Sequence, residues 1–463
     1  MIPTIYAGIL LLLICIIPMT RRKLVWTWRL FALAQVFGAT SVATLAALGG
    51  SSLLVPQAGA IVLMITAFLV LAPRDGATTG QAMRTHIFAI ILIAYTVVLT
   101  IFGPRIFAGQ IDLVAIKLDI VDGRIVALPL EPKPSNFAHA GYFICSFVTA
   151  IAVTLIFRKK LDAGEFRLGV LAAGVILASS ALVEGVAQMA HVDDIFSFLR
   201  NANYAMVNQI ILGVHRLSGF WPEPSAFAAA ALPYAVFSSE EWLDRRSWGT
   251  GLIALFIWTM LLASTSSTGI VGMAAYLALF VPRLLLGRST VLRVAAILSI
   301  AGVSLVFLGI YLFAPDSFDA MWQFVASLTV DKADSESAEQ RSGWAMQGWA
   351  AFKASYGLGL GAGTFRSSSL VLALIGTLGV IGAVLVLLYC LQLAGVAVLR
   401  TQRTASTQRS AAWAALMALV PLIISGATAD PGLIFAMFAG FALTVQRAGA
   451  PSPSAQMLTP VYE

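Results

Sequence analysis

Long apolar runs follow one another along nearly the whole chain, with short polar connections between them. Runs of about 18 or more residues are long enough to cross the hydrocarbon layer of a membrane as α-helices. The pattern therefore predicts an all-α integral membrane protein with about 12–14 transmembrane helices. The apolar segments lie at 2–19, 25–48, 53–72, 85–102, 138–157, 168–190, 225–238, 250–264, 269–283, 294–313, 368–392, 411–427 and 432–446.

The charges between these segments predict their orientation. Alternate connections together with Arg447 after the last segment contain 18 of the 29 Lys and Arg residues, and by the positive-inside rule these parts face the cytoplasm. Three long stretches, at about 103–137, 191–224 and 314–367, then lie on the outer side. We expect residues 1–447 to form a single polytopic domain, and residues 448–463 to be a disordered cytoplasmic tail.

Composition supports a membrane protein and argues against several other classes. The 463 residues are 59% hydrophobic and 11% charged, which exceeds what a soluble protein of this length can bury. The net charge of +7 lies in short clusters between apolar segments, so topology explains it without nucleic acid. Cys15, Cys145 and Cys390 fall inside apolar runs, so we expect neither a disulfide framework nor a CxxC site. The four histidines form no HxxxH pattern, and we expect no metal.

The outer stretches contain further helical patterns. Apolar periodicity predicts a helix on the membrane surface within 191–224 and two helices within 314–367. The second of these two begins at a capping box, Ser337 to Gln340, and ends at "YGLGLGAGTF", where alternate glycines prevent the helix from continuing. Such helices either cover a cavity or simply pack on the membrane surface. The glycines either permit close backbone approach or supply amides to an anion.

Four charged residues at loop–helix junctions on the outer side are candidate site residues. Arg216 and Glu223 stand at a membrane boundary, where charge is costly unless it faces water, a partner or a ligand. They form either a salt bridge that holds the loop, or a site in which the guanidinium binds an anion beside an acceptor or basic carboxylate. With Arg341 and Arg366 they offer three arginines that can clamp a diphosphate, whereas any single arginine can instead snorkel toward lipid headgroups.

Four further residues are candidates to contact the acceptor or line a cavity. Glu184 and His191 lie on one helix face near the outer end of a membrane segment, where a carboxylate suggests function or a buried hydrogen-bonding stripe. Trp221 lies between two potential turns, and Trp344 follows Arg341 in the late loop.

The stretch "RLSGFWPEPSAFAAA" resembles the "R…G…EPs" signature of bacterial polysaccharide polymerases in the O-antigen polymerase/ligase superfamily. The late loop is similar to that of this family, because Arg341 and Trp344 begin its helix and "GLGLGAGTFRSSSLVLALIGTLGVIG" leads into the next one. The likeness covers about residues 168–392 in layout. Two positions depart from the family pattern: Ser368 stands where many members have a histidine, and Thr268 stands near the arginine of "SxSR".

The resemblance implies a GT-C-like, multi-pass protein of the bacterial inner membrane whose active site faces the periplasm. It implies an inverting glycosyltransferase that needs no metal or cofactor and polymerises undecaprenyl-diphosphate-linked oligosaccharide repeats into a surface polysaccharide. Its expected partners are the lipid-linked oligosaccharide, membrane lipid, a chain-length regulator and a flippase. Arginines would neutralise the leaving diphosphate, and Glu223 is the candidate base because the family histidine is missing.

Alternatives remain open at this level. One is an O-antigen ligase that transfers glycan from undecaprenyl diphosphate to lipid A core or protein, and the missing histidine weakens it. Another is a transporter or lipid flippase, for which an inverted repeat is expected and none is seen. For the polymerase we expect a cavity walled by 168–392 and open sideways to the outer leaflet, with the helix of Trp344 and Trp349 in its roof.

Overall fold

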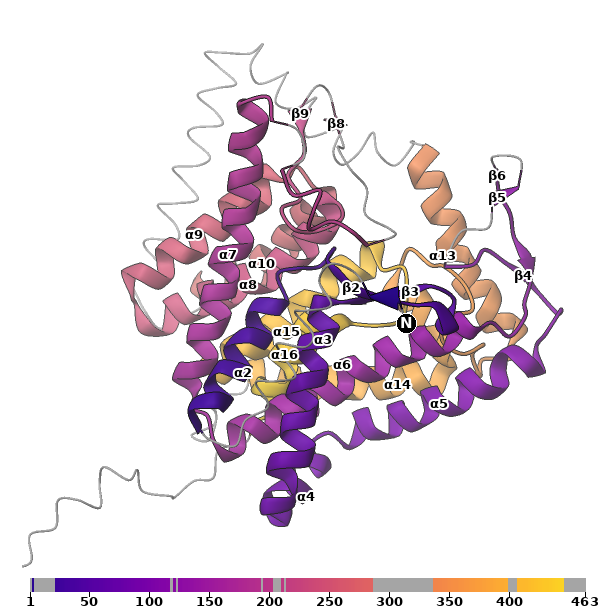
Figure 1. Ribbon diagram of the computed structural model, residues 1–463, viewed down its shortest axis with the longest axis horizontal. Helices are drawn as coiled ribbons and strands as arrows, with labels where there is room; N and C mark the ends of the chain where they lie inside the picture. Colours follow the sequence, from indigo (N-terminus) through magenta and orange to yellow (C-terminus); the bar gives the residue numbers. More distant parts are fainter. Residues whose placement is uncertain are drawn as a thin grey trace, which may run out of the picture.

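The computed structural model describes residues 2–3, 21–116, 120–121, 124–192, 195–202, 210–211, 214–285, 336–398 and 406–444. Over these ranges the chain is mostly helical, with a few short strands (Figure 1). The predicted segment 294–313, the first helix of the late loop and the tail 448–463 lie outside the described residues, as does most of the segment predicted at 2–19.

Six of the described helices are long and apolar enough to cross a membrane. They are α5 (Ile87–Ile106), α6 (Pro134–Lys159), α7 (Ala163–Met189), α10 (Ser267–Leu285), α14 (Leu370–Val398) and α15 (Ser406–Ser425). Other helices are α2 (Arg21–Ala34), α3 (Val55–Ile65), α4 (Gly76–Thr85), α8 (Pro224–Arg245), α9 (Trp248–Ala263) and α16 (Gly432–Ala442). The prediction of an all-α membrane protein is confirmed at this level, with six clear spans among the described residues.

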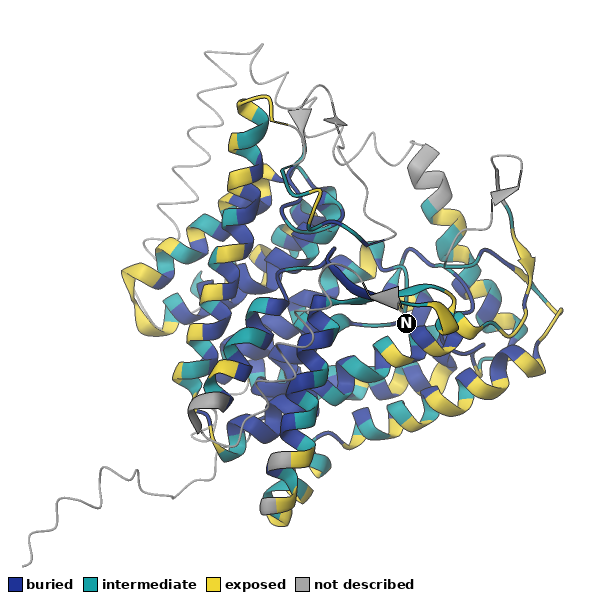
Figure 2. Ribbon diagram, viewed as in Figure 1, coloured by how far each residue is buried: buried dark blue, intermediate teal, exposed yellow. Residues whose placement is uncertain are grey.

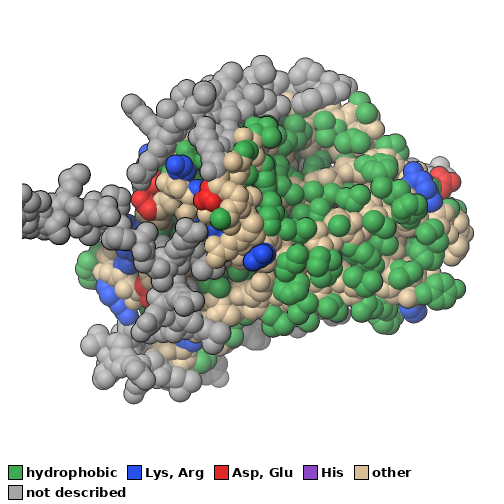
Figure 3. Space-filling model, turned by 90° about the horizontal axis from the view of Figure 1, so that it is seen from below, with side chains coloured by type: hydrophobic (Ala, Val, Ile, Leu, Met, Phe, Trp, Pro, Cys, Tyr) green, Lys and Arg blue, Asp and Glu red, His purple; other side chains and the backbone are tan. Residues whose placement is uncertain are grey.

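The outer faces of α5 and α14 expose large hydrophobic side chains. Ile91, Val98 and Phe102 of α5 and Val384 and Leu391 of α14 are all exposed. Figure 3 shows a broad hydrophobic surface with charged side chains toward its two ends. Exposed apolar area costs about 25 cal/mol per Å² in water, so a surface of this kind is suited to contact with lipid.

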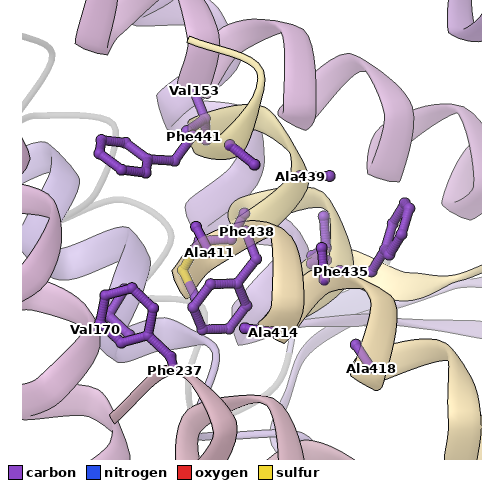
Figure 4. Close-up of a cluster of buried hydrophobic side chains, with 14 of the residues drawn as sticks. Val153, Val170, Phe237, Ala411, Ala414, Ala418, Phe435, Phe438, Ala439 and Phe441 are labelled. Carbon is purple, nitrogen blue, oxygen red and sulfur yellow. The ribbon is translucent and has the colours of Figure 1, made fainter. Parts of the chain in front are cut away.

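The core of the bundle is built around α16. Phe435, Phe438 and Phe441 recur every third residue and are buried among α6, α7, α8 and α15 (Figures 2 and 4). The ring of Phe441 stacks on that of Phe166 of α7, with centroids 3.7 Å apart. Gly440 lets α16 approach the backbone of α6 closely, because a Cβ there would lie 2.3 Å from a carbonyl oxygen.

The predicted membrane segment at 25–48 is wrong in its second half. After α2 the chain turns and forms β2 (Ser41–Leu45), which pairs antiparallel with β3 (Ser51–Leu54). The short strand β1 (Ile2–Pro3) pairs with the other edge of β2. Two consecutive glycines in the left-handed conformation reverse the chain between β2 and β3. Hydropathy alone does not separate such a strand from a helix, because both are apolar.

Short elements lie between the longer helices. They include η1 (Ala46–Leu48), η2 (Thr66–Leu71), η3 (Ala72–Arg74), β4 (Asp112–Leu113), β5 (Ile120–Val121), β6 (Arg124–Ile125), β7 (Leu128–Pro129), β8 (Ile210–Ile211) and β9 (Val214–His215). The surface helix predicted within 191–224 is not found, because the described parts of that stretch form turns and the β8–β9 hairpin. The predicted second helix of the late loop is confirmed as α13 (Glu336–Ala354), which packs on α14 (Figure 1).

Candidate functional site

The segment that carries Arg216 is fastened to the C-terminal part of α7. Gly219 has a φ of 56°, and a Cβ there would lie 2.2 Å from the Ser180 hydroxyl, so only glycine fits this approach. The backbone N–H groups of Ser218 and Gly219 each donate a 2.7 Å hydrogen bond to the Glu184 carboxylate. Glu184 therefore sets the path of the chain between Arg216 and α8.

Glu184 is also the partner of a buried arginine. Its Oε1 forms an ion pair with Arg200, whose Nε donates at 3.0 Å to the carbonyl oxygen of Gly219. Both side chains are less than a tenth exposed. A buried ion pair needs such additional hydrogen bonds to offset desolvation. The carboxylate is thus directed at protein groups, and the role predicted for Glu184 in contacting an acceptor is replaced by a structural one.

His191 and Trp221 do not meet the charged candidates in a common cavity. His191 is exposed beyond the end of α7, with a φ of 57°. Trp221 packs against the turn that follows α2, where a Cβ on Gly38 would lie 2.4 Å from the indole ring. Next to it, the ring of Phe220 stacks on that of Phe37, with centroids 5.0 Å apart. The tryptophan therefore anchors the segment on its other side.

Glu223 lies directly before the first turn of α8. It is extended, with a φ of −158°, and Pro224 occupies the first helical position, which suits a residue without an N–H. The Ser225 hydroxyl donates to Glu223 Oε1. The carboxylate is partly exposed, and none of the Lys and Arg side chains in the described ranges lies within 4.0 Å of it. The salt bridge between Arg216 and Glu223, one of the two sequence interpretations, is therefore not formed.

Glu223 nevertheless interacts electrostatically with two of the arginines, Arg216 and Arg366. Burial lowers the pKa of Arg216 and, separately, of Arg366. In both cases the Glu223 carboxylate raises the pKa and the Arg341 guanidinium lowers it further. We call Arg216, Glu223, Arg341 and Arg366 the arginine cluster. Residues from 191–224 and from 314–367, which are far apart in the sequence, are thus close enough to interact electrostatically.

Arg366 is the best-defined member of the arginine cluster. Its guanidinium lies over the ring of Trp344 on α13, with Cζ 4.5 Å from the ring centroid, and its Nη1 donates weakly at 3.4 Å to the carbonyl oxygen of Ile116. Its Nε is buried and has no hydrogen-bond partner among the described residues. Stacking on an aromatic face leaves the N–H edges of the guanidinium available to an anion.

The stretch 103–137 forms one wall of the arginine cluster. The N–H of Val114 donates to Gln347 Oε1 of α13 at 2.8 Å, and its carbonyl accepts from the N–H of Arg366 at 2.9 Å. On the other side, Arg216 Nη2 donates at 3.2 Å to the carbonyl oxygen of Thr265, in the turn between α9 and α10. Ser368, where the resemblance expects a histidine, donates its hydroxyl hydrogen to the carbonyl of Arg341.

The alternate glycines serve close backbone approach. The N–H of Gly359 donates at 2.9 Å to Ser355 Oγ, and that of Gly361 donates at 2.9 Å to the carbonyl of Thr377. A bend at Gly379 inside α14, with a φ of 61°, receives this segment: a Cβ there would lie 2.2 Å from the carbonyl oxygen of Gly357. Since these amides already donate to protein oxygens, the alternative that they bind an anion is not supported.

A small cavity lies between α5, α6, α14 and the loop that joins α15 to α16, and we call it the polar cavity because several polar side chains line it. It offers about 40 Å³ to the centres of water molecules. Its polar lining is Thr96, His139, Tyr142, Thr377, Thr428 and Asp430. This small chamber is not the wide cavity expected over 168–392, because much of its wall comes from α5, α6 and residues 428–430.

Asp430 was missed in the sequence. In "ATADPGL" it looks like an ordinary turn residue, although a lone carboxylate between two apolar segments is itself a signal of function. Its Oδ1 accepts a 3.0 Å hydrogen bond from the N–H of Gly432, and burial raises its pKa. No described group of three or more His, Cys, Asp or Glu side chains is placed to hold a metal ion.

No family model matches the chain, and a search of curated proteins finds no match either, so the function must be argued from the arginine cluster and its surroundings.

Proposed function

We propose that the chain is a glycosyltransferase that polymerises undecaprenyl-diphosphate-linked oligosaccharides at the outer face of the bacterial inner membrane, in a GT-C-like arrangement. The observation that carries this proposal is the convergence of Arg216, Arg341 and Arg366 with one carboxylate beside apolar helices. Three guanidinium groups and one carboxylate give a formal charge of +2, which complements a diphosphate. Arginine is also suited to phosphate because its planar fork donates two parallel hydrogen bonds.

In the proposed reaction the arginines stabilise the leaving group. The hydroxyl oxygen of the acceptor sugar forms a bond to the anomeric carbon of the donor, on the face opposite the diphosphate. The bond from that carbon to the diphosphate oxygen breaks, its electron pair leaves with undecaprenyl diphosphate, and the configuration inverts. Negative charge grows on the leaving oxygen, where fixed guanidinium groups stabilise it.

Glu223 has two roles open to it within this proposal. It accepts the proton of the acceptor hydroxyl, or it balances the arginines and holds them in position. Its electrostatic interaction with both Arg216 and Arg366 favours positioning. The ligase alternative gains no support from this geometry, because Ser368 offers no base where the resemblance expects a histidine.

The products of a strain that lacks the gene test the proposal. A polymerase deletion should leave single repeats on the glycan acceptor and no long polymer, and the wild-type gene should restore the polymer. Complete loss of single repeats as well would indicate a ligase or a flippase and would contradict the proposal.

A further inference from the structure

The polar cavity and the arginine cluster share a wall. Ile116 lines the cavity, and its carbonyl oxygen accepts from Arg366. Phe365, the neighbour of Arg366, also lines it. The next residue, Ser367, donates its N–H at 3.1 Å to the carbonyl of Ala427, in the loop that carries Asp430. The loop that carries Asp430 is therefore hydrogen-bonded to the segment that carries Arg366, which we propose to bind the diphosphate.

We propose that Asp430 is the catalytic base that accepts the proton of the attacking acceptor hydroxyl. This inference rests on the proposed function and assigns the step that the missing histidine leaves open. As the acceptor oxygen bonds to the anomeric carbon, its O–H bond breaks and the proton passes to the Asp430 carboxylate, which also interacts with the N–H of Gly432 and the Ser146 hydroxyl. The electron pair of the broken donor bond leaves with the diphosphate, which Arg216 and Arg366 bind. The proton and the negative charge are therefore accepted at different places.

The surroundings of Asp430 suit a base better than those of Glu223. Within the described part of the chain, no Lys or Arg side chain lies within 4.0 Å of Asp430. Glu223 likewise has no described Lys or Arg side chain within 4.0 Å, but it interacts electrostatically with Arg216 and Arg366 and accepts from Ser225. Burial also raises the pKa of Asp430, which strengthens it as a proton acceptor. Two carboxylates in different environments commonly take different roles in one reaction.

The size of the cavity limits what enters it. A water molecule needs about 10–15 Å³ by this measure, so 40 Å³ has room for a few waters or one hydroxyl-bearing edge of a sugar. The rest of the acceptor must remain outside. The titratable groups near Asp430 come from α6, namely His139, Tyr142 and Cys145, and the other polar lining residues are threonines. Asp430 is thus the acidic group among them.

The test uses the purified full-length protein in liposomes, with a lipid-linked repeat as donor and acceptor. Asp430→Asn keeps an oxygen for the N–H of Gly432 and removes a buried charge, so folding should be preserved. We expect turnover to fall by roughly 100-fold or more, with unchanged binding of undecaprenyl diphosphate and unchanged thermal unfolding. Asp112→Asn, the same change at an exposed residue on β4, should leave turnover at the wild-type level.

The outcomes separate this inference from the proposed function. If wild-type protein makes no polymer, the proposed function fails. If wild-type protein is active and Asp430→Asn is equally active, or if Asp430→Asn loses donor binding or unfolds early, Asp430 is not the base. The pH profile decides between the carboxylates: wild-type turnover should fall as acid protonates the base, and this fall should disappear in Asp430→Asn. Its disappearance in Glu223→Gln instead would assign the base to Glu223 and overturn the inference.

Discussion

Individual side chains in the arginine cluster are held by neighbours of very different kinds. Arg366 has an aromatic ring on its face and a backbone carbonyl at one end, whereas Arg216 reaches a carbonyl in the turn between α9 and α10. These contacts hold the guanidinium groups of Arg366 and Arg216 in place. A guanidinium held in a fixed position can present its N–H groups to a phosphate in one geometry.

Trp344 is a positioning residue for Arg366, and its removal should weaken donor use. We expect Trp344→Leu to lower kcat/KM by roughly tenfold, because a cation–π contact of this kind contributes about 1–2 kcal/mol. Trp344→Phe should recover most of the loss by restoring an aromatic face. The measurement is steady-state polymerisation with the lipid-linked repeat as the varied substrate.

Trp349 provides the matched control for this prediction. It lies on the same helix, is 41% exposed, and stacks on Phe352 rather than on an arginine. Trp349→Leu should leave kcat/KM within about twofold of wild type. Equal losses from both tryptophan variants would show that α13 is merely destabilised, and would argue against the positioning role.

At the scale of single residues, the sequence predicted types of chemistry better than roles. Arg216, Arg341, Arg366 and Glu223 were identified because charge at a membrane boundary is costly. Glu184 satisfied the same rule, but its carboxylate holds a loop, a difference that only the contacts with Arg200 and Gly219 reveal.

At the scale of elements, the site depends on how loops are attached to helices. The segment 216–223 is held by α7 through Glu184 and by the turn after α2 through Trp221. The glycine segment 357–363 crosses the bend of α14, and residue 114 joins the first outer stretch to α13. The segments that carry Arg216 and Arg366 are thus held by neighbouring helices and loops, as expected of a site that binds a leaving group in one geometry.

Glu184→Gln should destabilise the protein, because it replaces the carboxylate that pairs with the buried Arg200 by a neutral amide. Removing one partner of such a pair costs about 3–5 kcal/mol. Thermal unfolding in detergent measures this loss, and polymerisation should fall with it because the Arg216 segment is released.

Glu165→Gln is the comparison. Its 2.9 Å pair with Arg29 is partly exposed, with side chains 25% and 34% accessible, so its loss should cost less than about 1 kcal/mol. If Glu184→Gln unfolds at the same temperature as Glu165→Gln, the fastening role of Glu184 is incorrect.

The long helices could be predicted from apolar run length, because a membrane requires that length whatever the tertiary packing. The hairpin of β2 and β3 could not, since apolar strands and helices share a hydropathy profile. Among the described residues 195–202, the surface helix expected within 191–224 is replaced by turns. Hydrogen bonds that join Leu199, Asn201 and Ala202 to residues 39–41 determine the backbone there.

At the scale of the whole molecule, two kinds of surface meet beside one site. Apolar faces on α5 and α14 suit the lipid in which a polyprenyl tail would remain, while the arginine cluster suits its diphosphate. The polar cavity lies on the side of α5, α6 and α14, so the acceptor would approach from there. Helices α5 and α14 thus contribute both an apolar outer face and part of the cavity wall; in the proposed transfer the first would suit the polyprenyl tail of the donor and the second the acceptor hydroxyl.

The proposal that the chain polymerises lipid-linked oligosaccharides is tested most directly by measuring polymer formation by the purified protein in liposomes supplied with the lipid-linked repeat. Wild-type protein should release undecaprenyl diphosphate and make long polymer. Arg216→Lys should lower the rate about a hundredfold, since one lost transition-state contact costs on the order of 3 kcal/mol and an ammonium cannot replace the two-pronged donor. Arg105→Lys, an exposed arginine at the end of α5, should have the wild-type rate. Wild-type amounts of long polymer from well-folded Arg216→Ala would contradict the account.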